Sequence, residues 1–323
     1  MSPLTKSSLA LALTMCAALA LPARAQSVAG KKVLFVNSYH EGYPWSDGEE
    51  HGASAAFQGS GVELRFFRMD TKRHQDEAFR KQAAQKAKAE IEAFKPDLVI
   101  VADDPAVKYV LEAQFKNAKV PFVFCGVNWD ASKYGLPYSN ATGIVEVAPV
   151  KALVSNLRAL ARGGRVGYLT VDSETERIEG PSYAKTLGAP FATDLYAKTF
   201  AQWKEGFLRM QTDADLILLG NVAGINDWNE AEAKAFVLAN AKVPVGAAYD
   251  FMMPYAMLGL TKIEEEQGAW AGQTALRILR GASPASIPVA TNSQSKIFMN
   301  VKLAQAAKIV FRPEIVRSAQ VVQ

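Results

Sequence analysis

A loop of polar and aromatic residues follows the first compact apolar run of the chain, at 32–37. Ser38, together with backbone N–H groups at the start of a following helix, can hold an anionic group. Tyr39, Tyr43 or Trp45 can stack on a flat or cationic ligand. The alternative is structural, because Trp45 and the proline before it can pack a helix start against the core. Polar and aromatic residues together after a buried strand favour ligand binding.

Further polar residues follow other predicted strands, where parallel sheets bind ligands. Asp103 and Asp104 come after the apolar run at 98–102, and Asn128 follows the run at 121–124. We interpret Asp104 as a helix cap, which leaves Asp103 free to meet a donor or a cation. Equivalent strand ends in the second half of the chain carry Asp172, Asn221 and Asp250. Three aspartates suggest a ligand with an amine or several hydroxyl groups, and a compact amino-acid-like molecule fits best.

Sequence motifs of the common enzyme classes are missing. The chain contains no Gly-x-Ser-x-Gly, His-Glu-x-x-His, P-loop or Gly-x-Gly-x-x-Gly. Its three histidines, His40, His51 and His74, are not at ligand spacing, so we predict no metal and no cofactor. The three aspartates could imitate a catalytic carboxylate set, but a hydrolase needs a defined pair that flanks its substrate. We predict binding rather than catalysis, and turnover of the ligand would reveal a periplasmic enzyme instead.

Composition indicates a soluble globular protein of about two domains. The chain has 323 residues, of which 49% are hydrophobic and 21% charged. The net charge of +4 is too small and too dispersed for a nucleic-acid partner. Two cysteines, Cys16 and Cys125, exclude a disulfide framework. We interpret Cys125 as a buried, unreactive thiol in an apolar run.

The N-terminus has the pattern of a cleaved signal peptide. Lys6 precedes an almost uncharged apolar run at 9–21, and Ala23-Arg24-Ala25 is a small-x-small cleavage site. We predict cleavage after Ala25 and a periplasmic mature protein. The alternatives are a buried N-terminal helix and a lipoprotein; Met15 before Cys16 does not fit a lipidation signal. No later run is long enough to span a bilayer.

Strand and helix patterns alternate along the whole chain, which predicts an α/β protein with doubly wound parallel sheets. Predicted strands lie at 32–37, 62–67, 98–102, 121–124, 142–145, 166–171, 194–198, 215–220, 243–248 and 296–301. The Ser-x-x-Glu pattern at 46–49 and the Thr-x-x-Glu pattern at 261–264 predict capping boxes at two helix starts. Two successive strand–helix series of similar length predict two lobes that face each other across a cleft.

Three segments carry a resemblance to a known family: VLFVNSYHEGYPWS, PFVFCGVN and IPVATNSQSKIFMNVKLA. They resemble the ABC-transporter substrate-binding proteins of the type I periplasmic binding fold, which include tryptophan/tyrosine-type binding proteins and related sensor domains of kinases. The resemblance implies two Rossmann-like lobes joined by three crossovers, with the ligand between them. The first lobe would comprise 30–145 plus 252–285, and the second 146–251 plus 286–323.

Hinge closure is the mechanism that we expect, and within it we assign roles to six of the site residues. Ser38, Tyr39 and Asn128 would hold polar groups from the first lobe, Asp172 and Asn221 would close from the second, and Asp250 would sit at the hinge. The closed, monomeric protein would then dock on an ABC permease in the inner membrane. The alternative partner is a membrane receptor kinase, for which the protein would sense the ligand. The ligand itself is not specified by these residues.

Overall fold

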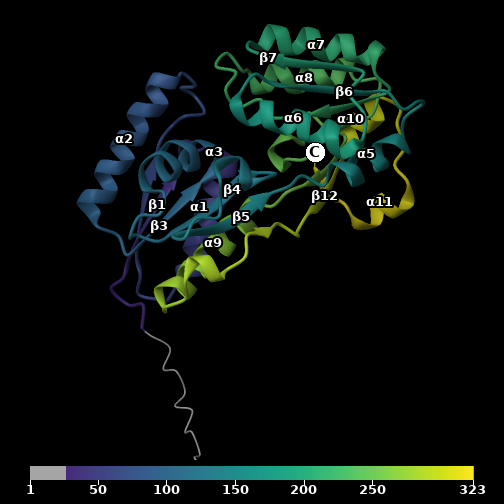
Figure 1. Cartoon of the computed structure of the whole chain (residues 1–323). Helices are drawn as coiled ribbons and strands as arrows, with labels where there is room; N and C mark the ends of the chain where they lie inside the picture. Colours follow the sequence, from purple (N-terminus) through teal and green to yellow (C-terminus); the bar gives the residue numbers. More distant parts are fainter. Residues whose placement is uncertain (1–26, 323) are drawn as a thin grey trace, which may run out of the picture.

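Two α/β lobes make up the computed structural model, which describes residues 27–322 (Figure 1). The predicted signal peptide at 1–25 lies outside the described residues. Each lobe contains one sheet with helices packed against it, so the predicted fold class, two doubly wound lobes, is confirmed. Among residues 27–322, no helix combines the length and the apolar character needed to cross a membrane.

The first lobe contains a sheet of six parallel strands in the order β2-β1-β3-β4-β5-β11. Its central strands are buried along their whole length, as expected for a parallel sheet covered on both faces. The strands are β1 Lys32–Asn37, β2 Glu63–Arg68, β3 Leu98–Ala102, β4 Phe122–Asn128, β5 Ala141–Glu146 and β11 Ala290–Thr291.

Helices α1 and α9 pack closely against each other on one face of this sheet. A Cβ at Gly268 would lie only 1.8 Å from the carbonyl oxygen of Glu49, so the two backbones touch there. The helices of this lobe are α1 Pro44–Phe57, α2 Glu77–Phe94, α3 Asp103–Ala106, a π-helical segment Val107–Glu112, α4 Ala113–Phe115 and α9 Glu264–Leu279, with 3₁₀ turns at Ala131–Tyr134 and Pro284–Ser286.

The second lobe contains a sheet of seven strands in the order β13-β12-β10-β9-β8-β6-β7. All neighbouring pairs are parallel except β10 and β12, which run antiparallel. The strands are β6 Val166–Val171, β7 Thr193–Ala197, β8 Leu216–Leu219, β9 Val245–Ala247, β10 Leu258–Thr261, β12 Lys296–Asn300 and β13 Gln320–Val322. The helices are α5 Val150–Arg158, α6 Glu174–Leu187, α7 Phe200–Asp213, α8 Glu230–Asn240, α10 Val301–Ala306 and α11 Pro313–Ser318, with a 3₁₀ turn at Asp250–Met252.

The chain crosses between the lobes three times: after β5, after β10 and after β11. Strand β10 pairs with β9 and β12 of the second sheet, whereas β11 pairs with β5 of the first. This sheet membership differs from the sequence-based division, which placed 252–285 in the first lobe and 286–323 in the second. Strand β10 was not expected, because its four residues follow a loop rich in aromatic and methionine residues and contain a glycine.

Both predicted capping boxes are wrong. Helix α1 begins at Pro44, with Tyr43 at the N-cap and no side-chain cap. Helix α9 begins at Glu264, where Ile263 is the N-cap, again without a side-chain cap. In both cases the capping pattern is not used, and the first turns of the two helices lie against each other, because a Cβ at Gly48 would lie 2.4 Å from Cβ of Glu264.

Candidate ligand-binding site

The carboxyl ends of strands from both sheets face each other across a small buried cavity of about 10 Å³. That volume fits about one water molecule. Both lobes contribute to the lining, so the lobes are closed on one another. The lining residues are Tyr39, Tyr43, Trp45, Lys72, Asp103, Asn128, Glu146, Thr175 and Tyr249.

Two tyrosines of the first lobe hydrogen-bond to the second lobe across this cavity. The hydroxyl of Tyr39 lies 2.9 Å from the Thr175 hydroxyl at the start of α6. The side-chain amide of Asn221, just after β8, donates to the hydroxyl of Tyr43. The two tyrosine rings pack edge to face, with their centroids 5.5 Å apart. These side chains therefore fill the space between the lobes and also connect them.

Polar contacts around the cavity reinforce the closure. The indole N–H of Trp129 in the first lobe donates to Glu179 of α6, over 2.7 Å. At the rim, Glu174 of the same helix accepts from Arg80 and, over 3.1 Å, from Lys108. Helix α6 thus supplies several of the contacts that the second lobe makes with the first.

Lys72 places a buried positive charge at the cavity. Its ammonium group lies 4.5 Å from the ring centroid of Tyr39 and 5.3 Å from that of Tyr43. No residue of the described chain hydrogen-bonds to this ammonium group. Burial lowers the pKa of Lys72, and the nearby Glu176 carboxylate opposes this. A buried cation held only by ring faces favours a partner that carries an anion.

Asp103 places a carboxyl group at the same cavity. Its backbone lies in the left-handed region, with φ of 68°, at the first position after β3. Its Oδ2 is buried without a donor partner among the described residues, and Glu49 beneath it has none for either carboxyl oxygen. The carboxyl groups of Asp103 and Glu49 approach the same point at Gly126, where a Cβ would meet them at 2.8 and 2.4 Å.

Burial and mutual repulsion favour the protonated form of the Asp103–Glu49 pair. Burial raises the pKa of Glu49 well above its usual range, and the neighbouring Asp103 raises it further. Burial also raises the pKa of Asp103, as does repulsion from Glu146. A protonated Glu49 can donate to Asp103, which leaves Oδ2 of Asp103 as an acceptor that faces the cavity.

Asp104 is not a helix cap, contrary to the sequence-based interpretation. Its carboxylate accepts from the backbone and side-chain N–H groups of Asn128, the latter over 2.7 Å, and from the Tyr134 hydroxyl over 2.7 Å. Lys133 lies 2.8 Å away. Asp104 thereby orients Asn128, whose Oδ1 remains without a donor partner among the described residues at the cavity.

A buried ion-pair cluster lies where the chain crosses between the lobes. Lys262, just after β10, contacts Glu146 at the end of β5 and lies 2.9 Å from Glu179 of α6. Burial would lower the pKa of Lys262, but the Glu146 and Glu179 carboxylates outweigh burial and raise it. Burial raises the pKa of Glu146 to about 7, against the influence of Lys262. We call Glu146, Lys262 and Glu179 the hinge cluster.

Five of the predicted site residues line the cavity: Tyr39, Tyr43, Trp45, Asp103 and Asn128. Asn221 does not line it but contacts Tyr43. The hydroxyl of Ser38 is buried and occupied, because it donates to the Ala102 carbonyl and accepts from the Ala106 N–H. Ser38 therefore fastens β1 to the start of α3.

Two predicted aspartates lie away from the cavity. Asp172 is partly exposed and pairs with Arg177 at 2.8 Å and with Lys198 at 3.8 Å. Asp250 lies in the 3₁₀ turn after β9, beside Glu264. The side chains beside these two aspartates, Arg177, Lys198 and Glu264, do not line the cavity.

Four lining residues were missed: Lys72, Glu146, Thr175 and Tyr249. Glu146 ends β5 directly, so the rule applied to the other strands would have found it. Lys72 comes four residues after β2, and Thr175 follows the serine that caps α6. Tyr249 precedes Asp250, which the sequence did single out. The spacing of Lys72 and Thr175 gave no reason to prefer them.

Histidines contribute little to this region. His40 lies 3.6 Å and His74 3.7 Å from the same Asp70, outside the cavity lining. Within residues 27–322, no group of three or more His, Cys, Asp or Glu side chains is placed to hold a metal ion. Cys125 is buried and free, and burial raises its pKa, which keeps the thiol protonated.

The family comparison concerns the C-terminal third of the chain. Residues 219–323 match the sequence model of the family described as ABC transporter substrate binding protein. No curated protein is detectably similar in sequence.

Solved structures match nearly the whole fold. A Streptococcus pneumoniae protein in complex with L-Trp has 19% identity and a TM-score of 0.68, over 90% of this chain and 99% of the other. A ligand-free, open substrate-binding protein from Clostridium difficile has 18% identity and a TM-score of 0.65, over 91% and 99%. A solute-binding protein from Agrobacterium vitis bound to α-D-tagatopyranose has 14% identity and a TM-score of 0.60, over 90% and 99%.

These identities are low, so the structural matches bear on the fold. They agree with the resemblance found in the sequence, which is confirmed. The chain therefore has the two-lobed type I periplasmic binding fold of ABC transporter substrate-binding proteins, and its residues 219–323 carry the sequence pattern of that family.

Proposed function

We propose that this protein is a solute-binding protein that captures a small amino-acid-like molecule between its lobes and delivers it to an ABC permease. The proposal rests on two groups of opposite charge that line one cavity and have no hydrogen-bond partner among the described residues. The Lys72 ammonium and Asp103 Oδ2 are both buried there without a partner among the described residues. Burying such groups is costly, so a ligand that supplies both counter-charges is favoured.

The remaining lining suits the rest of such a molecule. The ring pairs Tyr39–Tyr43 and Trp45–Tyr249 offer apolar faces, the latter edge to face at 5.8 Å. Asn128 Oδ1 offers one more acceptor. In this proposal Lys72 binds the ligand carboxylate, and Asp103 and Asn128 bind its ammonium group.

Entry of the ligand requires the lobes to open. A cavity of about 10 Å³ is far smaller than the roughly 300 Å³ or more of ordinary ligand pockets. Opening separates α6 from the first lobe and frees Tyr39 and Tyr43 to move aside. The mechanism is hinge closure around the ligand, with the closed surface presented to the permease. As part of the same proposal, the protein is exported and works in the periplasm.

The experiment is a binding screen with matched chemical series. Each L-amino acid is compared with its decarboxylated amine, its deaminated acid and neutral sugars, by thermal shift and then calorimetry. We expect one amino acid to bind, and each single-charge analogue to bind at least about tenfold more weakly. At 100 times its Kd the ligand should add about 2.7 kcal/mol of stability.

Two results would contradict the proposal. A neutral sugar that binds at least as tightly as any amino acid would remove the role of the two charges. Mass spectrometry of the ligand after incubation provides the second check, because a changed mass would indicate turnover and an enzyme.

A further inference from the structure

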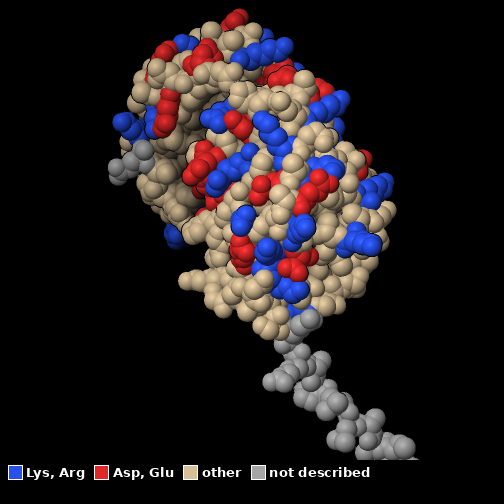
Figure 2. All heavy atoms as spheres, turned by 90° about the vertical axis from the view of Figure 1, so that its left-hand side faces the viewer, with Lys and Arg blue, Asp and Glu red and all other residues tan. Residues whose placement is uncertain are grey.

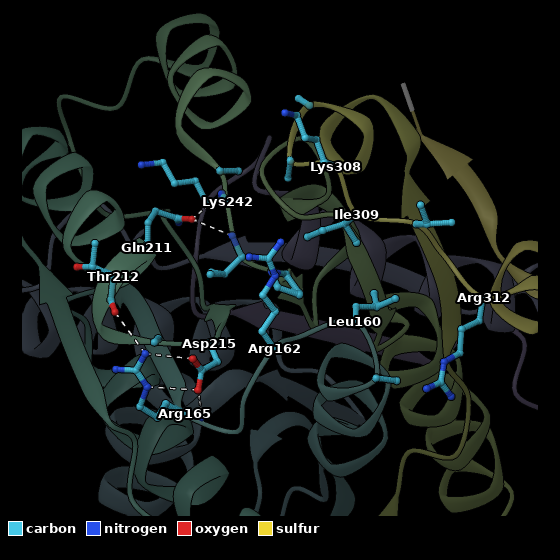
Figure 3. A pocket seen from close by; sticks show the side chains of 18 residues that line it. Leu160, Arg162, Arg165, Gln211, Thr212, Asp215, Lys242, Lys308, Ile309 and Arg312 are labelled. Atoms are coloured by element: carbon cyan, nitrogen blue, oxygen red, sulfur yellow. Dashed lines mark hydrogen bonds and ion pairs between the residues drawn. The ribbon is translucent and has the colours of Figure 1, made fainter.

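A large concavity lies on the second lobe, at the end of its sheet opposite the ligand cavity. Strands β6, β8 and β9 begin there, and helices α5, α7, α8 and α10 end there. The concavity has a volume of about 790 Å³, within the range of small-molecule sites. We call it the basic groove, for the side chains that line it (Figure 3).

Positive charge dominates the basic groove. Its lining contains Arg162, Arg165, Lys242, Lys308 and Arg312, but only one acidic residue, Asp215. Asp215 is already engaged, because Arg165 binds both of its carboxylate oxygens. The other four cations make no ion pair with any carboxylate of residues 27–322.

The excess of positive charge is confined to the basic groove and is not a property of the whole protein. Four unpaired cations gather in one concavity, while the complete chain has a net charge of only +4. By contrast, acidic and basic side chains are interspersed over the face of the molecule that Figure 2 shows. Four like charges repel one another, and a bound anion would offset that repulsion.

The helices that end at the basic groove explain only some of its positively charged residues. A cation near a helix C-terminus is stabilised by the helix dipole, by about 0.3–1 kcal/mol. This applies singly to each helix that ends here. It gives no reason for Arg162, from the segment after α5, and Arg312, before α11, to line the same concavity.

Apolar side chains line the groove beside the cations. Leu160, Val243 and Ile309 contribute to it, and Val310 is 85% exposed at its edge. Val310 is one of four large hydrophobic side chains that stand exposed among residues 27–322. A ligand that combines an anion with an apolar portion would cover both kinds of surface.

We propose that the basic groove binds a phosphate-bearing ligand that also has an apolar portion. The planar guanidinium groups of Arg162 and Arg312 match phosphate oxygens in pairs, and Lys242 and Lys308 add point charges. Such a phosphate has two sources, a soluble phosphate ester or the headgroup of an anionic phospholipid. The site is separate from the ligand cavity and does not depend on the proposed function.

The test titrates inorganic tripolyphosphate, as a soluble probe of the charge, into the whole mature protein and follows binding by calorimetry. We expect saturable binding that weakens as salt rises. The double variant Arg162→Gln/Arg312→Gln should bind at least about tenfold more weakly. The matched control is Arg277→Gln/Arg280→Gln, which removes two exposed arginines from the end of α9 on the other lobe and should bind like the wild type.

The proposal fails if the wild type does not bind tripolyphosphate, or if the control variant loses as much affinity as the groove variant. Two further arms identify the source. The phospholipid would be assigned if the wild type sediments with phosphatidylglycerol vesicles but not with phosphatidylcholine vesicles. The groove variant should then no longer sediment with phosphatidylglycerol vesicles. Binding of a soluble alkyl phosphate without sedimentation would assign the phosphate ester. Binding of neither, with tripolyphosphate binding kept, would overturn the apolar part of the proposal.

Discussion

Lys72 carries the most unusual chemistry of any single residue at the cavity. Most buried lysines in proteins have a carboxylate or carbonyl partner, but this ammonium group meets two ring faces and no hydrogen-bond acceptor among the described residues. Its charge therefore costs stability when nothing is bound, and the same charge is available to a ligand. Stability and affinity should respond in opposite directions when it is removed.

Replacement of Lys72 by methionine tests this opposition. The Lys72→Met variant should unfold at a higher temperature than the wild type without ligand, because the chain then buries a thioether in place of an unpaired cation. Its affinity for the amino acid found in the screen should fall by at least about tenfold. Lys81→Met, on the exposed side of α2, is the control and should change neither quantity appreciably. Unchanged affinity in Lys72→Met would exclude Lys72 from the ligand site.

Glu264 should make the stability of the folded protein depend on pH. Burial raises the pKa of Glu264 to about 8, and repulsion from Asp250 adds to this. In the unfolded chain this pKa returns to about 4.3, so the folded state holds a proton that the unfolded state releases between these values. The stability that this proton confers is present at low pH and is lost as pH rises from about 4.3 towards 8.

The variant Glu264→Gln should remove that loss. Urea unfolding at pH 5, 6.5 and 8 should show the wild type declining relative to the variant as pH rises, by about 1.4 kcal/mol for each pKa unit that separates the two states. Glu205→Gln, at an exposed position on α7, serves as the control. Parallel curves for the wild type and Glu264→Gln would show that Glu264 titrates normally.

At the residue scale, the sequence was informative where a strand end coincided with an unusual loop. Tyr39, Tyr43 and Trp45 stood out because aromatic and polar residues were crowded together. Asp172 was misleading, because a strand end predicts the edge of the sheet but not which way a side chain turns; here it turns to Arg177. The Asp103–Glu49 pair needed the tertiary structure, since α1 brings Glu49 next to Asp103, which follows it by 103 − 49 = 54 residues in the sequence.

Helices α1 and α9 depend on glycine for their contact. Gly52 on α1 and Gly268 on α9 let the two backbones approach, and a Cβ at either would lie under 2.5 Å from a backbone carbonyl oxygen of the other helix. Such contacts cannot be relieved by rotation of a side chain. The helices would have to separate, and Glu49 on α1 would move away from Asp103.

Gly268→Ala should therefore destabilise the protein by about 1–3 kcal/mol, in spite of the better helix propensity of alanine. The control is Gly164→Ala, where a Cβ would meet nothing within 4 Å and φ is not positive. The control should stay within about 0.5 kcal/mol of the wild type. Equal effects in the two variants, measured by urea unfolding, would show that the helices are not in tight contact.

Element types followed from periodicity, whereas several element boundaries did not. Helix α2 has helical hydrophobic spacing, and the buried strands β1 and β3 are short continuous apolar runs rich in β-branched residues. Short strands such as β10 and β11 have four and two residues, too few for a period to be recognised. Their places in the sheets come from neighbouring strands, so the positions of the second and third crossings could not be predicted.

For the whole molecule, the hinge cluster joins two crossing segments to α6 of the second lobe. Glu146 and Lys262 lie on the first and second crossings. Glu179 forms an ion pair with Lys262 and accepts a hydrogen bond from Trp129 of the first lobe. Loss of the Glu179 charge should weaken the closed state more than it weakens either lobe, because each lobe also has core residues of its own.

Glu179→Gln should thus shift the protein towards an open form. Small-angle X-ray scattering of the ligand-free variant should give a larger radius of gyration than the wild type, and ligand affinity should fall because part of the population must close first. Glu205→Gln, on the same lobe and exposed, is again a suitable control. An unchanged radius of gyration in Glu179→Gln would mean that the cluster does not hold the lobes together.

The three crossings also determine when the protein can complete its folding. The apolar face of the first sheet is covered by residues of α9, including Ala271 and Ala275, and its edge by β11, all of which are synthesised after nearly the whole second lobe. Until the ribosome has passed residue 291, neither lobe holds all of its own strands. Neither lobe of a nascent chain can therefore complete its sheet until synthesis is almost finished.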